Sequence, residues 1–281
     1  MYGNFPDFAH SLIVTVRTPN RCATSRRVNS RSIIQPTLHA ISPVGKIEIL
    51  RYAESMRAGR YATIPSRSRA SELQLAIDAL LPQTDFIVVV INDPSNSVVW
   101  PEYPEDKVLY IYEPMDPPNL SKLWNIGLDA CSAHARSNDF IEWDTAVVND
   151  DCTVPQGWFD ACVQAMDDTC AVAASTDITK RRKHPLTHCA PGPVNLYHRL
   201  CGYAFMLRGE AGVRADETLC WWYGDDDIDW QSRVLGGTVI VPGFPVTHTH
   251  PNESTVGSEV LSRQAGLDRE TFLAKWGSLP C

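Results

Sequence analysis

The chain has 281 residues, of which 44% are hydrophobic and 9% aromatic, as expected for a globular protein with a substantial core. It contains no apolar run of about 18 residues, so we expect no membrane span. A net charge of −8 argues against non-specific binding to duplex DNA as the main activity. Nine cysteines without a CxxC pair predict reduced thiols. With no secretory signal pattern at the N-terminus, we expect a cytoplasmic protein.

The N-terminal region is basic and irregular in pattern. Residues 1–70 hold 11 Lys and Arg against 3 Asp and Glu, whereas the remainder holds 14 against 30. Its acid-poor composition also suits a transit peptide, but the runs at 12–16 and 46–50 are typical of folded strands. We therefore predict a basic N-terminal extension over 1–58, a main domain over 59–255 and a helical tail over 256–281.

From residue 59 the hydrophobic pattern alternates between strands and helices. A strand at 60–65 is followed by a helix at 72–81, in which Leu73, Ile77 and Leu80 share one face. The continuous apolar run at 86–93 predicts a strand that is covered on both faces. Further elements follow as strand 107–113, helix 120–135, strand 140–150 and helix 157–168. This order predicts an α/β fold with an open, mostly parallel sheet, helices on both faces and ligands at the carboxyl ends of the strands.

The second half of the chain has a weaker pattern. Residues 179–195 look like a loop, and their basic run at 180–184 is either a solvated surface or a neutralising group for a diphosphate. A strand is predicted at 200–210, where Gly202 permits close backbone approach. A helix is predicted to end near 237, a further strand lies within 238–251, and an amphipathic stretch covers 268–277.

Three adjacent polar residues, Asn149, Asp150 and Asp151, end the strand at 140–150. Neighbouring carboxylates destabilise one another unless a cation or ligand compensates their charge. Hard divalent cations such as Mg²⁺ take oxygen ligands of this kind. An Asx turn explains the same spacing, so the sequence leaves a turn and a metal site as equal alternatives.

A second acidic cluster stands at the start of the helix that ends near 237. Its members are Asp225, Asp226, Asp227 and Asp229. Acids at this position favour the helix dipole and can cap the helix, which accounts for one or two of them. Packed like charges raise one another's pKa, which suits a general base. Trp221 and Trp222, directly before the cluster, suit either a sugar-stacking wall or the core.

His248 and His250 form a His-x-His pair near the end of the main domain. Alternate residues of a strand face the same side, so both imidazoles are expected to point one way. Such a pair can bind a metal ion, although an isolated pair more often does not.

Taken in order, these features resemble the GT-A-fold glycosyltransferases of family 2, especially their rhamnosyltransferase-like branch. The matching stretches are YATIPSR (61–67), VVVINDPS (88–95), NLSKLWNIGLDA (119–130), VVNDDCTVPQGWF (147–159), CGYAFMLRGEAGVRADETL (201–219), GDDDIDWQSR (224–233) and PVTHTH (245–250). The fourth stretch resembles the D-x-D motif with Asn149 in the first position. The sixth resembles E-D-x-D-L-x-x-R, with Asp226 in place of Glu. The resemblance implies a GT-A-like fold and leaves residues 1–58 outside it.

The resemblance implies inverting, metal-dependent transfer of a sugar from a nucleotide-sugar donor to an acceptor hydroxyl. It implies Mn²⁺ or Mg²⁺ as cofactor, held by Asp151 with His248 or His250. Asp227 is the implied catalytic base, with Asp226 as the next choice. Residues implied to bind the nucleotide sugar are Pro65, Arg67, Asn92, Asp93, Asn125, Asn149 and Asp150. Those implied on the acceptor side are Gly202, Tyr203, Trp221 and Trp222.

Two other classes of function remain open at this point. One is a degenerate module that binds a nucleotide or sugar without turnover, against which the intact acids Asp151 and Asp227 count. The other is a different nucleotide-sugar or nucleotidyl enzyme, against which the late histidines and paired tryptophans count. The acceptor is expected to be a glycan, a protein or a modified nucleic acid.

Overall fold

The computed structural model describes residues 58–176, 185–251 and 253–281. Apart from its last residue, the predicted extension over 1–58 lies outside the described residues. So do the strands expected at 12–16 and 46–50 and the basic run at 180–184.

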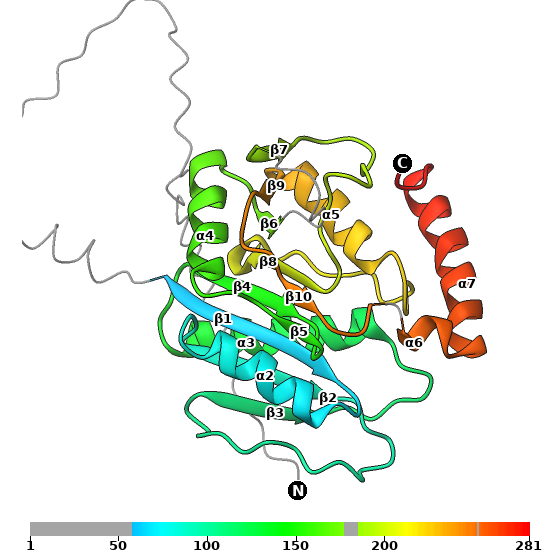
Figure 1. The fold of residues 1–281 in the computed structure, drawn as a ribbon. Helices are drawn as coiled ribbons and strands as arrows, with labels where there is room; N and C mark the ends of the chain where they lie inside the picture. The colour runs from blue at the N-terminus through cyan, green and yellow to red at the C-terminus, as the bar shows by residue number, and fades with distance from the viewer. Residues whose placement is uncertain (1–57, 177–184, 252) are drawn as a thin grey trace, which may run out of the picture. The chain divides into compact units, whose positions relative to one another are not determined.

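An eight-stranded mixed sheet forms the centre of the described part (Figure 1). Its strands are β1 (Gly59–Ser66), β2 (Phe86–Ile91), β3 (Val108–Tyr112), β4 (Trp143–Val148), β6 (Ala173–Thr176), β7 (Thr187–Cys189), β8 (Ala204–Arg208) and β9 (Thr238–Val241). They lie in the order β3-β2-β1-β4-β8-β6-β9-β7. The first four in this order run parallel, β8 is antiparallel to both neighbours, and β7 is antiparallel to β9. A small second sheet pairs β5 (Cys152–Thr153) with β10 (Thr247–His248).

Helices cover both faces of the large sheet. They are α2 (Ala70–Leu80), α3 (Leu120–Ser137), α4 (Trp158–Thr169), α5 (Gly224–Leu235), α6 (Glu253–Val256) and α7 (Glu259–Trp276), with a short 3₁₀ helix, η1 (Gly209–Ala211). Because side chains alternate along β1, Ile64 packs with α2 and α4, whereas Tyr61 packs with α3 on the other face. Figure 1 shows α2 and α3 on opposite sides of β1 and β2. The predicted fold class, an α/β fold with an open mixed sheet and helices on both faces, is confirmed.

Within the large sheet, the structure contains two strands that the sequence pattern did not indicate. Strand β6 has the sequence AAST, and its small side chains give no strong strand signal, although all four residues are buried. Strand β7 lies inside the stretch 179–195, which we expected to be a loop, and it forms by antiparallel pairing with the edge of β9. Both strands therefore depend on their neighbours in the sheet rather than on local propensity.

Two bulk expectations can be compared with the structure. Among the described helices, none is long and apolar enough to cross a membrane. Seven described cysteines carry free thiols, but Cys170 is disulfide-bonded, so the expectation of reduced thiols is wrong for that residue.

A close contact between α3 and β1 determines how α3 packs on the first half of the sheet. Gly127 of α3 lies against Thr63 of β1, and a Cβ atom at Gly127 would overlap the Thr63 side chain. Thr63 is fully buried in the central strand, so it has no room to move aside. Glycine at position 127 therefore allows the helix to approach the strand closely.

We expect Gly127→Ala to lower the free energy of unfolding by about 1–3 kcal/mol, because overpacking displaces α3 from the sheet. The matched control is Gly266→Ala in α7, where an added Cβ meets no atom within 4 Å. That change should be neutral or stabilise the protein by up to about 1 kcal/mol, since Ala favours helix over Gly. Urea denaturation measures both variants, and equal unfolding free energies would contradict this account of the contact.

Candidate functional site

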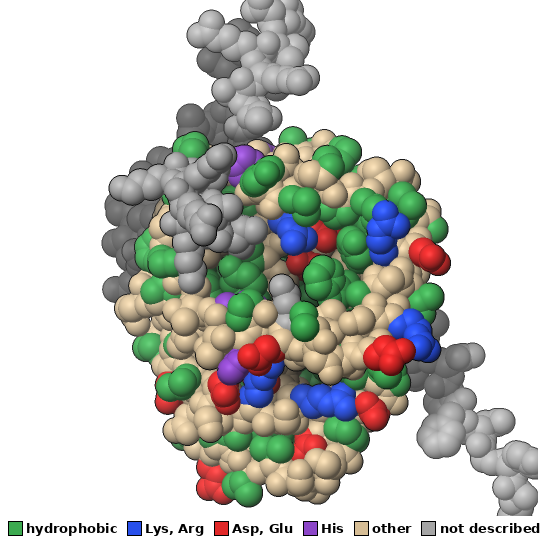
Figure 2. Space-filling view, turned by 45° about the vertical axis from the view of Figure 1, so that its right-hand side comes forward, with side chains coloured by type: hydrophobic (Ala, Val, Ile, Leu, Met, Phe, Trp, Pro, Cys, Tyr) green, Lys and Arg blue, Asp and Glu red, His purple; other side chains and the backbone are tan. Residues whose placement is uncertain are grey.

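A cleft of about 1200 Å³ opens at the carboxyl ends of the parallel strands. Its first wall consists of residues 65–69 at the end of β1, Asn92 after β2 and residues 149–151 after β4. Its second wall includes residues 201–203 before β8, the start of α5 and parts of the C-terminal segment. Figure 2 shows acidic and basic side chains close together around hollows lined by hydrophobic groups. The cleft therefore lies where open α/β sheets bind ligands.

Two buried carboxylates dominate the first wall. The Ser66 hydroxyl donates to Asp150 Oδ2 at 2.8 Å, and Arg69 Nη1 donates to Asp151 Oδ2 at 2.6 Å. Burial raises the pKa of Asp150 to about 6, with Asp151 adding to the shift and Ser66 opposing it. Burial alone would raise the pKa of Asp151 as well, but the hydrogen bond and charge of His248 and the charge of Arg69 lower it. Asp151 therefore keeps its charge to a lower pH than Asp150 does.

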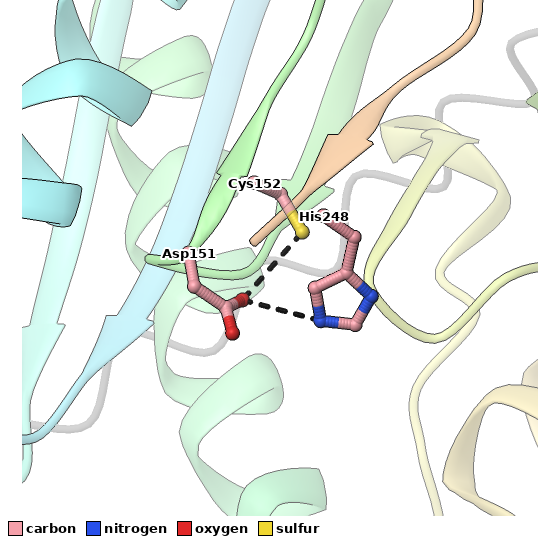
Figure 3. A group of neighbouring side chains, drawn as sticks. All are labelled: Asp151, Cys152 and His248. Carbon is pink, nitrogen blue, oxygen red and sulfur yellow. Dashed lines mark hydrogen bonds and ion pairs between the residues drawn. The ribbon is translucent and has the colours of Figure 1, made fainter. Parts of the chain in front are cut away.

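Asp151, Cys152 and His248 form a compact group of potential metal ligands (Figure 3). One ligand atom from each lies within 4.8 Å of the others. Figure 3 shows the His248 ring directed at Asp151, with Nε2 and Oδ1 3.4 Å apart. The pairing of β5 with β10 sets His248 opposite Cys152, and the Thr249 N–H donates to the Asp151 carbonyl at 3.0 Å. The small second sheet thus brings together residues nearly 100 positions apart.

The chemistry of these ligands fits a hard or borderline divalent cation. Burial raises the pKa of the Cys152 thiol, which donates to Asp151 Oδ1 at 3.6 Å, so the sulfur is a protonated neighbour of the carboxylate. The remaining donors are a carboxylate and an imidazole. In addition, Asn149 Oδ1 is buried without a hydrogen-bond partner among the described residues. Oxygen donors with one imidazole suit Mn²⁺, and oxygen donors alone suit Mg²⁺.

His250 lines the same cleft as His248, but its ring pairs with different side chains. Strand β10 ends at His248, so the strict alternation of a strand does not extend to His250. The His250 ring instead pairs with Glu253 at 2.8 Å and with Glu72 at 3.5 Å. The hydrogen bond to Glu253 raises the pKa of His250. Of the two histidines, His248 is the one that the structure brings to Asp151.

Several residues implied to bind a nucleotide do line the first wall, and their binding of a nucleotide stays a prediction. Pro65, Arg67 and Asn92 face the cleft together with the acids. Asn92 is 1% exposed; its Oδ1 accepts from the Met115 N–H at 2.8 Å. Its Nδ2 is buried without a hydrogen-bond partner in the described part of the chain. Because an unmade hydrogen bond at a buried amide is costly, this donor is suited to a ligand acceptor atom.

Two of the implied nucleotide-binding residues are not among those that line the cleft. The Asp93 carboxylate accepts backbone N–H groups of Ser95 and Ser97, each at 3.0 Å, and closes the loop after β2. Asn125 exchanges hydrogen bonds of 2.9 and 3.0 Å with the backbone of Ala215. Both side chains hold loops in place, a role that motif spacing does not distinguish from ligand contact.

The second wall holds another carboxylate pair with one guanidinium. Arg199 Nη1 lies 2.7 Å from Asp226 Oδ1 and 3.9 Å from Asp225 Oδ2. The Gly202 N–H donates to Asp225 Oδ2 at 2.9 Å. Burial raises the pKa of Asp226 to about 7, with Asp225 adding to the shift and Arg199 opposing it. This wall therefore carries a carboxyl group that changes its protonation near neutral pH.

Asp227, the first candidate for the catalytic base, is not among the residues that line the cleft. It is fully buried, and Oδ1 accepts from Lys275 Nζ at 2.8 Å and from Trp276 Nε1 at 2.9 Å. Oδ2 accepts from the Asp216 N–H at 3.0 Å and from Gln231 at 2.8 Å. This arrangement is that of an anchor between α5 and α7, and the members of this acidic cluster that line the cleft are Asp225 and Asp226.

The C-terminal segment is part of the second wall. The buried Asp268 of α7 accepts the N–H groups of Cys220, Trp221 and Trp222 at 3.1, 2.7 and 2.8 Å. Trp222 is 39% exposed, and both tryptophans line the cleft with Gly202 and Tyr203. The segment predicted as a tail thus fixes the aromatic part of the wall.

Sequence reasoning missed Arg69 and Arg199, the guanidinium groups that compensate the two carboxylate pairs. Arg69 lies after a strand, at the edge of the sheet where ligands bind. Its position there, together with the acids after β4, could have indicated that it compensates their charge. Arg199 lies 27 positions before its partner Asp226, and no local pattern indicated the pairing.

Comparison with known proteins gives a structural likeness only. No family model and no curated protein matches the chain. Among solved structures, S. aureus TarS 1–349 is similar with a TM-score of 0.48 and 11% identity over 73% of this chain. The same protein in complex with UDP gives a TM-score of 0.47 with 10% identity, and in complex with UDP-GlcNAc 0.44 with 9%. These two alignments cover 78% and 79% of this chain and 72% and 73% of the other. This chain spans 65% of TarS 1–349 and 44% of TarS.

We expect Asp227→Asn to lower the free energy of unfolding by about 1–3 kcal/mol, because Lys275 and Trp276 lose a charged acceptor. The matched control is Asp116→Asn, which removes the ion pair with Arg67 at 2.9 Å, where 72% of the Asp116 side chain is exposed. That exposed pair contributes about 0–1 kcal/mol. Urea denaturation measures both variants. An Asp227→Asn protein that keeps full stability but loses activity would instead support a catalytic role.

Proposed function

We propose that this protein is an inverting, metal-dependent glycosyltransferase that moves a sugar from a nucleotide-diphosphate sugar to an acceptor hydroxyl. The observation that carries the proposal is that one cleft contains two separate groups of carboxylates with different surroundings. Asp151 with His248 offers ligands for a divalent cation, and the second wall of the same cleft presents Asp226 with a pKa of about 7. Donor binding is thereby assigned to the first wall and proton removal from an acceptor to the second.

The donor binds along the first wall in this proposal. Asn92 Nδ2 and Arg67 offer hydrogen-bond donors to the nucleoside, and Asp151, His248 and Asn149 would hold Mn²⁺ or Mg²⁺. Such a cation, when bound, would supply Lewis-acid stabilisation of the departing nucleoside diphosphate. The low pKa of Asp151 supports this role, because a ligand must be deprotonated to bind a metal.

Asp226 acts as the general base on the second wall. Its carboxylate takes the proton from the acceptor hydroxyl, and the acceptor oxygen then forms the bond to the anomeric carbon. The bond from that carbon to the diphosphate oxygen breaks, and the leaving group keeps the electron pair. A single displacement of this kind inverts the anomeric centre. Arg199 holds the Asp226 side chain in position through their contact at 2.7 Å.

The acceptor lies against Trp222, Tyr203 and Gly202. An exposed indole offers a face on which a sugar ring or another flat apolar group can pack. The proposed acceptor classes are a glycan, a protein and a modified nucleic acid. The competing function is a module that binds a nucleotide sugar without turnover.

We expect the wild-type protein with Mn²⁺ to release a nucleoside diphosphate from at least one donor in a panel of nucleotide sugars, as detected by mass spectrometry. Asp151→Asn should reduce the release at least about 100-fold, because the charged metal ligand is lost. Addition of EDTA should have the same effect on the wild type. Donor binding without release supports the binding module, and neither binding nor release by the wild type overturns the proposal.

We further expect Asp226→Asn to lower kcat by about 10²–10⁴-fold with little change in the donor KM, because the general base is lost. In the wild type, kcat should fall as the pH drops below about 7, since Asp226 takes up a proton there and can no longer accept one. The pH–rate profile measures this. A profile without such a fall would remove Asp226 from the role, and Asp225→Asn then tests the neighbouring carboxylate.

A further inference from the structure

Arg69 occupies the position beside the proposed metal ligands. It lies three residues after the end of β1 and is the N-cap residue of α2, where its side chain lines the cleft. Its Nη1 atom lies 2.6 Å from Asp151 Oδ2 and 3.6 Å from Asp150 Oδ1. Its other contact is a hydrogen bond from Nη2 to the Ser254 hydroxyl at 3.4 Å. The Arg69 side chain is 25% exposed and borders the cleft, so it has room to move into it.

A divalent cation bound to Asp151 would compete with this guanidinium. Both are positive, and they would share one carboxylate inside a buried site where screening by water is weak. In the free protein, Arg69 and His248 already compensate the Asp151 charge. A cation that binds without a diphosphate must therefore break part of these interactions. The affinity for a cation alone is lowered by the cost of breaking the Arg69–Asp151 pair.

The diphosphate of a donor provides a new partner for the displaced guanidinium. Arg binds phosphate oxygens through two parallel N–H groups, in the same way as it binds a carboxylate. The other arginine on this wall, Arg67, pairs through Nη2 with Asp116 at 2.9 Å, and the proposed function assigns its remaining donors to the nucleoside. Once the diphosphate is present, the cation can take Asp151 while Arg69 takes the phosphate, and no charge is left without compensation.

We propose that Arg69 is a diphosphate-binding residue which Asp151 holds in the free protein and which exchanges Asp151 for the donor when the cation binds. The inference rests on the proposed function and adds to it a specific coupling between the two ligands. The diphosphate gives Arg69 a new partner, which offsets the cost of breaking the Arg69–Asp151 pair when a cation binds. The cation in turn replaces Arg69 at Asp151 and leaves it available to the diphosphate. Cation and diphosphate therefore bind cooperatively. Thermodynamic linkage requires the same factor in both directions, and couplings of this kind are about 5–150-fold.

The first measurement is the affinity for MnCl₂ alone, followed by the electron paramagnetic resonance signal of free Mn²⁺ with the full chain. We expect Arg69→Gln to bind Mn²⁺ about tenfold more tightly than the wild type, because the competing charge is gone. Arg69→Lys keeps a positive charge and should bind Mn²⁺ with nearly wild-type affinity. The matched control is Arg263→Gln on α7, where an exposed Arg–Glu pair is lost and the net charge changes equally. That control should leave the affinity unchanged.

The second measurement is the affinity for inorganic pyrophosphate at a fixed Mn²⁺ concentration, by isothermal titration calorimetry corrected for the complex that the two form in solution. Pyrophosphate carries the diphosphate chemistry without dependence on the nucleobase. We expect Arg69→Gln to bind it about tenfold more weakly than the wild type and the coupling between the two ligands to shrink accordingly.

Unchanged or weaker Mn²⁺ binding by Arg69→Gln overturns the inference, and so does unchanged pyrophosphate binding. If the wild type acts on a donor but these affinities do not shift, the exchange is wrong and the proposed function stands. If the affinities shift as expected but no donor is turned over, the exchange stands for a diphosphate-binding site and the proposed transferase activity fails.

Discussion

The site depends on the burial of acidic groups at the carboxyl ends of parallel strands. Asp150 and Asp151 follow β4 and are 8% and 4% exposed, so each loses most of its hydration. Charges removed from water are tolerated only when hydrogen bonds and counter-charges replace the solvent. Ser66, Arg69 and His248 provide these partners, and all three come from other elements. The first wall therefore forms only when β1, β4 and β10 are all in place.

The second wall meets the same constraint in a different way. Asp225 and Asp226 begin α5, where helix N–H groups and the dipole favour acids, and Arg199 supplies the nearby positive charge. The pKa of Asp226 rises to about 7 while that of Asp151 is lowered. Two carboxylates in one cleft are thereby given different protonation behaviour, which suits one to a cation and the other to a proton. Their surroundings, rather than their residue type, make this difference.

The C-terminal helix has a larger part in this arrangement than a tail would have. The Asp268 carboxylate accepts hydrogen bonds from three consecutive backbone N–H groups before α5. Lys275 Nζ lies 2.8 Å from a carboxylate oxygen of Asp216 and 2.8 Å from one of Asp227. Trp276 stacks on Trp230 of α5 with ring centroids 4.9 Å apart. The start of α5 is thus held in place by α7. Asp227 serves this anchoring network, which explains why it is buried next to residues that face the cleft.

The sequence by itself determined the α/β class, the order of the main strands and helices, and the acidic end of β4. These features follow from local periodicity and from polar residues at strand ends, both of which are properties of short stretches. It also indicated His248, but not that His250 turns to Glu72 and Glu253. Only the tertiary structure decided which acid faces the cleft, because Asp226 and Asp227 are neighbours whose roles depend on α7. The guanidinium partners Arg69 and Arg199 were likewise decided by the fold, since charge compensation joins residues distant in the chain and leaves no periodic signal in the sequence.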